Sequence, residues 1–169
     1  MKRNIELKAK CRDLAFARDA ALRTGARAEG ILMQTDTYFH VPHGRLKLRE
    51  IAGQRAELIW YARSNQTAFR ASDYVVSPVA DVPTMLTALM SALRIRGTVK
   101  KRRELLLYEN VRIHLDSVDT LGSFLEFEAV VSDQHNEQIS HQRLATLTEA
   151  LQIADTDRIA VSYSDLAGL

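Results

Sequence analysis

Two glutamates, Glu126 and Glu128, lie two positions apart in a stretch that alternates strictly between charged and apolar residues, 124–130. In an extended strand both side chains leave the same face, roughly 7 Å apart. Like charges on one strand face repel each other unless a cation lies between them. Carboxylate oxygens are the ligands that Mg²⁺ and Mn²⁺ prefer. The spacing therefore predicts either a shared divalent cation or an ordinary solvated sheet face.

Cationic side chains follow the same alternation elsewhere in the chain. Arg45, Lys47 and Arg49 share one face of a short stretch, and they repel one another unless an anion covers them. Arg and Lys bind phosphate oxygens, and cations combined with a metal around one polyphosphate suit phosphoryl transfer. The cations on these faces are Lys8, Lys10, Arg45, Lys47, Arg49, Arg63, Lys101, Arg103 and Arg112, and the carboxylates are Glu6, Asp116, Glu126 and Glu128.

The elements that carry these residues form a repeated pattern. A period of two predicts strands, and a period near 3.6 with capping residues predicts helices. Helices are expected after Asp13, between Asp81 and Gly97, and over 134–152, and the C-terminal tail is expected to pack through Tyr163 and Leu166. The predicted strands span 3–11, 31–40, 45–49, 57–63, 70–77, 99–104, 105–116 and 124–131. The order strand, helix, strand, strand, strand thus occurs twice, over 3–63 and 70–131.

Two architectures fit this pattern. An open antiparallel sheet would keep its charged face in water while helices cover the apolar face. Eight strands are also enough to close into a barrel, and closure with the charged face inward would give a charged tunnel. The alternation of residues does not choose between them.

Composition narrows the class of protein. The chain has 169 residues, a formal net charge of +2 and 46% hydrophobic residues, which fits one globular domain. It shows no membrane-length apolar run and no signal peptide, and the lone Cys11 excludes an internal disulfide, so a cytoplasmic protein without membrane contact is expected.

The basic run 100–103 lacks stacking aromatics, which argues against nucleic-acid binding. The five histidines show no zinc-type spacing, and His114 is a candidate substrate contact.

The order of the motifs resembles the CYTH family of triphosphate tunnel enzymes, which is named for class IV adenylate cyclases and thiamine triphosphatases. The similarity extends over nearly the whole chain. It implies a single domain over 1–169 with an α+β fold, a closed eight-stranded antiparallel barrel with helices outside. It also implies a triphosphate substrate bound with Mg²⁺ or Mn²⁺. The matching segments are Asn4-x-Glu6-x-Lys8, Gly44–Arg49, Val99-x-Lys101-x-Arg103, Asp116 and Leu121–Glu128.

The resemblance also implies roles for individual residues. Asn4 occupies the position where the family signature has glutamate; its amide oxygen can coordinate a hard cation but cannot act as a base. The metal ligands implied are Glu6, Asp116, Glu126 and Glu128, with Asn4 as a weaker candidate. The catalytic residues implied are Glu6, Lys8, Glu126 and Glu128. The triphosphate-binding residues implied are Lys8, Lys10, Arg45, Lys47, Arg49, Arg63, Lys101, Arg103 and Arg112.

The activity expected from the resemblance is that of an adenylate cyclase, which converts ATP to cyclic AMP and pyrophosphate. A triphosphatase acting on tripolyphosphate, thiamine triphosphate or a nucleoside triphosphate is the alternative, because water and a ribose hydroxyl need the same phosphate cradle. The neutral Asn4 leaves a third class open, a non-catalytic binder of triphosphates or RNA 5′ ends. A homodimer is compatible with the sequence.

Overall fold

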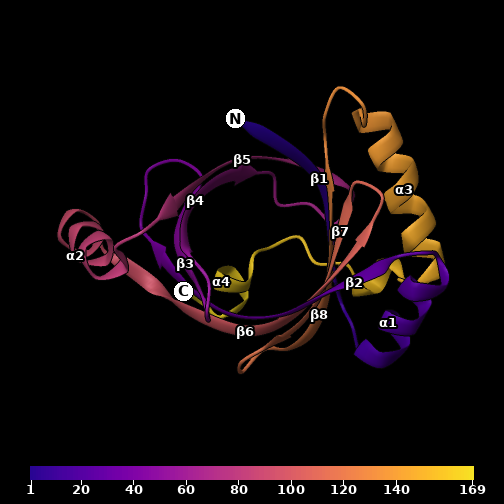
Figure 1. The fold of residues 1–169 in the computed structure, drawn as a ribbon, viewed down its shortest axis with the longest axis horizontal. Helices are drawn as coiled ribbons and strands as arrows, with labels where there is room; N and C mark the ends of the chain where they lie inside the picture. The colour runs from indigo at the N-terminus through magenta and orange to yellow at the C-terminus, as the bar shows by residue number, and fades with distance from the viewer.

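Eight strands close into an antiparallel barrel, which Figure 1 shows nearly end-on. The structure is a computed structural model that describes residues 1–169. The strands are β1 (Lys2–Lys10), β2 (Arg27–Phe39), β3 (Arg45–Ile51), β4 (Ala56–Arg63), β5 (Arg70–Val79), β6 (Ile95–Tyr108), β7 (Val111–Val118) and β8 (Gly122–Val130). The predicted closed barrel is therefore confirmed, and the open sheet is excluded.

The order of strands around the barrel is β1-β5-β4-β3-β2-β6-β7-β8. Each half of the chain contributes one strand, a helix and then three strands joined by short turns, as the sequence predicts. The first strands of the halves pair with each other, β1 with β5, and so do the second strands, β2 with β6. Pairing of β1 with β8 closes the ring.

Four α-helices pack outside or at one end of the barrel. Helix α1 (Leu14–Arg23) begins after Asp13, whose side chain accepts a hydrogen bond from the Phe16 N–H at 2.8 Å. Helices α2 (Val82–Ala92) and α3 (Glu137–Ala150) are capped in the same way by Asp81 and Asn136. None of the helices combines the length and the apolar character needed to cross a membrane.

The main hydrophobic core lies between the outer wall of the barrel and the helices. Ile5 and Leu7 of β1 and Phe127 of β8 point outward and are fully buried against α1 and α3. Because successive side chains alternate across a strand, the charged residues between them point into the barrel. A second apolar cluster places α2 over the outer faces of β3 and β4.

The C-terminal segment fills one end of the barrel. Helix α4 (Tyr163–Leu166) follows a short 3₁₀ turn (Asp155–Asp157), and Figure 1 shows it within the ring of strands. Tyr163 is 3% exposed and packs against the inward-facing Phe124 and Val99. Leu166 joins the same cluster, so the predicted packing of the tail is confirmed. The barrel is closed at this end by its own chain.

Strand boundaries differ from the prediction chiefly at the β6–β7 turn and at the starts of β2 and β6. Strand β6 begins at Ile95, inside the stretch that was predicted to be helical up to Gly97. The sequence predicts separate strands over 99–104 and 105–116, whereas β6 continues to Tyr108 and the turn lies at Glu109 and Asn110. Glu109 has a φ of 53°, the left-handed conformation that a tight turn uses. Strand β2 begins at Arg27 rather than Ile31, because its pairing with the long β6 continues past an irregularity between Ala28 and Gly30.

Candidate functional site

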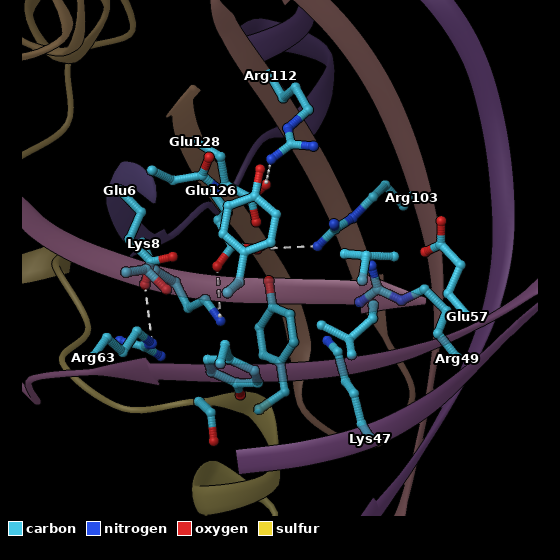
Figure 2. A pocket seen from close by; sticks show the side chains of 18 of the residues that line it. Glu6, Lys8, Lys47, Arg49, Glu57, Arg63, Arg103, Arg112, Glu126 and Glu128 are labelled. Carbon is cyan, nitrogen blue, oxygen red and sulfur yellow. Dashed lines mark hydrogen bonds and ion pairs between the residues drawn. The ribbon is translucent and has the colours of Figure 1, made fainter. Parts of the chain in front are cut away.

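The inward faces of the strands enclose an open cavity in which charges of both signs meet (Figure 2). It contains about 820 Å³ of space free of protein atoms, part of it continuous with solvent, which is within the range of small-molecule sites. Seven cationic side chains line it against four carboxylates, so the wall favours an anion. The cations are Lys8, Lys47, Arg49, Arg63, Lys101, Arg103 and Arg112, and the carboxylates are Glu6, Glu57, Glu126 and Glu128.

One buried carboxylate, that of Asp36 on β2, holds three of these cations. Its Oδ2 accepts hydrogen bonds from the Nζ atoms of Lys47 at 3.0 Å and Lys101 at 2.7 Å. Arg49 donates to both Asp36 oxygens, at 2.7 and 2.8 Å. Burial alone would raise the pKa of Asp36, but the three cations outweigh it and hold the pKa well below its usual value. The protein itself thus supplies part of the negative charge that the cations of β3 require.

A second buried carboxylate, Asp116 on β7, holds Arg103. The Arg103 guanidinium donates to both Asp116 oxygens, at 2.7 and 2.6 Å, and its Nη2 also donates to Glu126 at 3.1 Å. The Tyr163 hydroxyl donates to Asp116 at 2.8 Å. Asp116 is fully buried and does not line the cavity. Its surroundings therefore suit a residue that orients Arg103, and its role as a metal ligand stays a prediction.

Glu6 lies beside two arginines and directly opposite Glu128 on the neighbouring strand. Its Oε1 is 2.9 Å from Nε of Arg63 and 3.0 Å from Nε of Arg70, and Arg70 is almost completely buried. Asn4, in the amide orientation that satisfies its neighbours, accepts a hydrogen bond from Arg112 at 3.0 Å. A cation held by Asn4 or Glu6 would lie beside guanidinium groups, and the role of these two residues as metal ligands stays a prediction.

Glu126 and Glu128 point into the cavity side by side, as the alternation predicts (Figure 2). Lys8 lies 3.3 Å from Glu126, and Arg112 lies 2.8 Å from Glu128. His114 faces both from the neighbouring strand, and one donor atom from each of the three residues lies within 4.8 Å of the others. Burial and the nearby Arg103 lower the pKa of His114, so the imidazole is neutral at pH 7. Two carboxylates and a neutral imidazole fit one divalent cation.

Two predicted phosphate ligands lie outside the cavity. Lys10 is exposed on the outer end of β1, beside Cys11. Arg45, although on the charged side of β3, bonds to Asp165 of α4 at 3.0 Å and to Asn65 at 3.0 Å. Both sit near the end that the C-terminal segment closes, and their positions do not support a phosphate-binding role. The predicted residues that do line the cavity are Asn4, Glu6, Lys8, Lys47, Arg49, Arg63, Lys101, Arg103, Arg112, Glu126 and Glu128.

Several residues of the site are not identified by the sequence analysis. Asp36 and Arg70 are single charges in strands of mixed character, and nothing in their local pattern marks them as partners of residues on other strands. Tyr163 is expected as a packing residue, but it also contacts Lys8, whose Nζ lies 3.6 Å from the centre of its ring. The pattern of inward positions on β2 and β5 could have suggested Asp36 and Arg70 once closure was assumed.

Two lysines of the cavity have pKa values near neutrality. Burial lowers the pKa of Lys101 from 10.5 to about 7, although Asp36 opposes this shift. Burial and the adjacent Arg49 likewise lower the pKa of Lys47 to about 8. A bound polyphosphate would favour the charged form of both groups.

Comparison with known proteins agrees with this architecture. The CYTH domain family matches residues 2–163. A protein of Methanocaldococcus jannaschii, provisionally named an adenylate cyclase, is 32% identical over 71 residues, which are 42% of this chain and 41% of that protein's length. The PH1012 protein of Pyrococcus horikoshii has a TM-score of 0.83 at 22% identity, over 96% of this chain and 98% of that chain.

A second solved structure of the same fold comes from Hippeastrum. It is an adenylyl cyclase candidate described as having a dominant triphosphatase activity, with a TM-score of 0.60 at 14% identity over 99% of this chain and 94% of that chain. Identities this low show the common fold alone. The match along residues 2–163, together with the closed barrel and its charged interior, shows that the chain belongs to the CYTH domain family.

Proposed function

We propose that this protein is a divalent-metal-dependent enzyme that acts on the triphosphate group of a small molecule, most closely as an adenylate cyclase that converts ATP to cyclic AMP and pyrophosphate. The observation that carries the proposal is the meeting of a cationic wall with Glu126 and Glu128 inside one cavity. A triphosphate carries several negative charges, and this wall has the complementary sign. The cavity also has room for it.

The cations are held in place before any ligand arrives. Asp36 fixes Lys47, Arg49 and Lys101, and Asp116 fixes Arg103. Charged groups that are already oriented stabilise developing negative charge without reorganising during the reaction. Removing water from the buried cavity strengthens each of these interactions. These residues would therefore bind the phosphates and stabilise the charge that develops as a P–O bond breaks.

Glu126 and Glu128 would hold the divalent cation. A bound cation there would supply charge neutralisation at the phosphates and activation of the attacking oxygen. Lys8, which contacts Glu126, would gain a phosphate oxygen as a new partner. Tyr163 covers Lys8 and limits its access to water.

The open end of the cavity favours a substrate with an organic group beyond its phosphates. Tyr74, Val76 and Ile59 line the cavity, and Val76 is 41% exposed. Apolar and aromatic surface beside a charged interior suits a base or another flat ring. This supports ATP over tripolyphosphate as the substrate.

Hydrolysis is the second candidate, because the cavity is open to solvent and water can reach a bound phosphate. The Hippeastrum protein of the same fold is described with a dominant triphosphatase activity. The cations that bind the phosphates would be the same in hydrolysis and in cyclisation. Only the attacking oxygen would differ, from water in the first and from a ribose hydroxyl in the second.

The test incubates the full chain with ATP, tripolyphosphate and thiamine triphosphate, each with Mg²⁺ or Mn²⁺. Cyclic AMP with pyrophosphate identifies a cyclase, and orthophosphate release identifies a hydrolase. Glu126→Gln and Glu128→Gln should each lower metal-dependent turnover by at least about a hundredfold, because each removes a charged ligand. Glu50→Gln, at an exposed position on β3, is the matched control. Binding without turnover of any substrate would refute the enzyme proposal.

A further inference from the structure

His114 is a buried imidazole with an unpartnered nitrogen that faces the two glutamates. The residue is 4% exposed, and its Nδ1 makes no hydrogen bond. This atom lies 3.6 Å from Oε2 of Glu126 and 4.0 Å from Oε1 of Glu128. Both distances exceed those of a hydrogen bond, and an unmet buried polar atom costs roughly 1–3 kcal/mol. A ligand between the three residues would satisfy the nitrogen.

The spacing of the three residues suits a small cation. One donor atom from each lies within 4.8 Å of the others. Donors that share one such cation lie roughly 2.0–2.2 Å from it, and therefore up to ~4.4 Å from one another. Side-chain shifts of a few tenths of an ångström would complete the site.

The barrel register fixes this arrangement. His114 pairs directly with Glu126 between β7 and β8, and Arg112 pairs with Glu128 one inward position further along. The imidazole and the carboxylates therefore share an inner wall built from two hydrogen-bonded strands. A one-residue slip would turn all of them outward.

We propose that His114 supplies a nitrogen ligand to the divalent cation held by Glu126 and Glu128, and that the site consequently favours Mn²⁺ or another first-row transition ion over Mg²⁺. The proposal rests on the proposed function only for the use of this cation with a triphosphate. Imidazole suits transition ions, whereas Mg²⁺ takes oxygen ligands and gives up its waters reluctantly.

The inward residues of β1 border this site. Asn4 and Glu6 face Arg112, Arg63 and Arg70, and Glu6 also lies directly opposite Glu128 on the neighbouring strand. Lys8 and Arg103 contact Glu126, and Arg112 contacts Oε2 of Glu128, whereas His114 faces Oε1. Oε1 of Glu128 thus faces His114 while Oε2 of the same side chain is held by Arg112, and Oε2 of Glu126 is shared between His114 and Arg103.

The experiment adds Mn²⁺ alone to the metal-free full chain, without nucleotide. Electron paramagnetic resonance measures the bound ion, and electron spin-echo modulation detects nitrogen directly bound to it. His114→Gln is compared with His43→Gln, a control at an exposed loop position. We expect nitrogen modulation in the wild type and in His43→Gln but not in His114→Gln. Affinity for Mn²⁺ in His114→Gln should fall by at least about tenfold, as losses near metal ligands do, and the preference for Mn²⁺ over Mg²⁺ should shrink.

A measurement on the unaltered sequence covers the case in which His114→Gln fails to fold. Labelling histidine with ¹⁵N should convert the modulation to the ¹⁵N pattern, and of the five histidines it is His114 that faces Glu126 and Glu128. Bound Mn²⁺ without nitrogen coupling, or unchanged affinity in a folded His114→Gln variant, would overturn the proposal. Nitrogen coupling without turnover of any triphosphate would leave the metal site standing and refute the proposed function instead.

Discussion

Asp36 neutralises cations that belong to two other strands. Lys47 and Arg49 on β3 and Lys101 on β6 would repel one another, and the sequence predicts that an external anion must cover such cations. The structure places one carboxylate among all three. The cavity therefore has a stable form without ligand, and a triphosphate joins cations that are already oriented.

We expect Asp36→Asn to weaken tripolyphosphate binding at least about tenfold, because Lys47, Arg49 and Lys101 lose the carboxylate that orients them. The free energy of unfolding should fall by roughly 3–5 kcal/mol, because removing one partner from a buried ionic cluster leaves uncompensated charge. Calorimetric titration measures the binding, and Asp133→Asn, at an exposed position, is the control. A role limited to stability would leave affinity intact once the variant is folded.

The low pKa of Lys101 leads us to expect proton uptake when a ligand binds. Burial sets its pKa to about 7 and that of Lys47 to about 8, so both are largely charged below neutrality and lose charge as the pH rises through these values. A bound phosphate restores the charged form, and at about pH 8 binding should therefore take up protons.

Titration calorimetry in two buffers of different ionisation enthalpy measures this uptake. Lys101→Met should take up fewer protons than the wild type at about pH 8, whereas Lys100→Met, whose side chain is exposed on the same strand, should not differ. Below about pH 6 the difference should vanish, because both lysines are then already protonated. Equal uptake in both variants would contradict the low pKa of Lys101.

Single residues were predictable where their strand carries a regular pattern. Glu126, Glu128, Lys47 and Arg49 lie in faultless alternation, and each points into the cavity. The roles of Asp36 and Asp116 required knowledge of strand pairing and register, because their partners are on other strands: Asp36 binds Lys47 and Arg49 of β3 and Lys101 of β6, and Asp116 binds Arg103 of β6. Local spacing contains no such information.

At the scale of elements, the sequence predicted the order of strands and helices better than their ends. The repeat of one strand, a helix and three strands is confirmed. The β6–β7 turn differs from the prediction because the four consecutive cations Lys100–Arg103 interrupt the alternation of charged and apolar residues. This interruption suggests a strand end near Glu104, whereas β6 continues to Tyr108. The closing role of the C-terminal segment was missed because α4 has a single turn, too short for a period to be recognised.

The C-terminal segment is anchored through Asp165. Its carboxylate contacts Arg45 at 3.0 Å and Arg96 at 2.8 Å, and it accepts hydrogen bonds from the N–H and hydroxyl of Ser162. Burial alone would raise its pKa, but the Ser162 and arginine contacts hold the pKa well below its usual range. The resulting stability is present above the unfolded pKa, about 3.9, and is lost as the pH falls below it.

Asp165→Asn should therefore lower the free energy of unfolding by about 1–3 kcal/mol at neutral pH, the range for hydrogen bonds to charged groups. Chemical denaturation at neutral and acidic pH measures the effect, and hydrogen exchange locates it in residues 155–169. The gap between variant and wild type should narrow below about pH 4. A gap that stays constant across this range would show that the charge of Asp165 is not the cause.

At the scale of the whole molecule, the apolar and polar parts have exchanged their usual places. The interior of the barrel is charged, and the core that stabilises the fold lies outside it, beneath α1 and α3. Mutations that alter stability and mutations that alter ligand binding therefore belong to opposite faces of the same strands.

Phe127→Ala tests this separation. Phe127 is fully buried in the outer core, and its loss should lower the free energy of unfolding by about 3–5 kcal/mol. Tripolyphosphate affinity, measured under conditions where the variant is folded, should stay within about twofold of the wild type, because Phe127 does not line the cavity. A twofold change in affinity corresponds to well under ~1.4 kcal/mol of binding free energy. Phe16→Ala, at an exposed side chain, is the stability control. A large loss of affinity would show that the two faces are coupled.

Under the proposed function, the closed end of the barrel would set the order in which products leave. With α4 filling one end, anything bound deep among the lysines and arginines must pass the opening near Val76. A nucleotide that enters with its phosphates foremost keeps its sugar and base nearest to that opening. After cyclisation the cyclic nucleotide would depart first and pyrophosphate last. Pyrophosphate would then compete directly with the incoming substrate, and clearance of pyrophosphate from the surroundings would govern the rate of turnover.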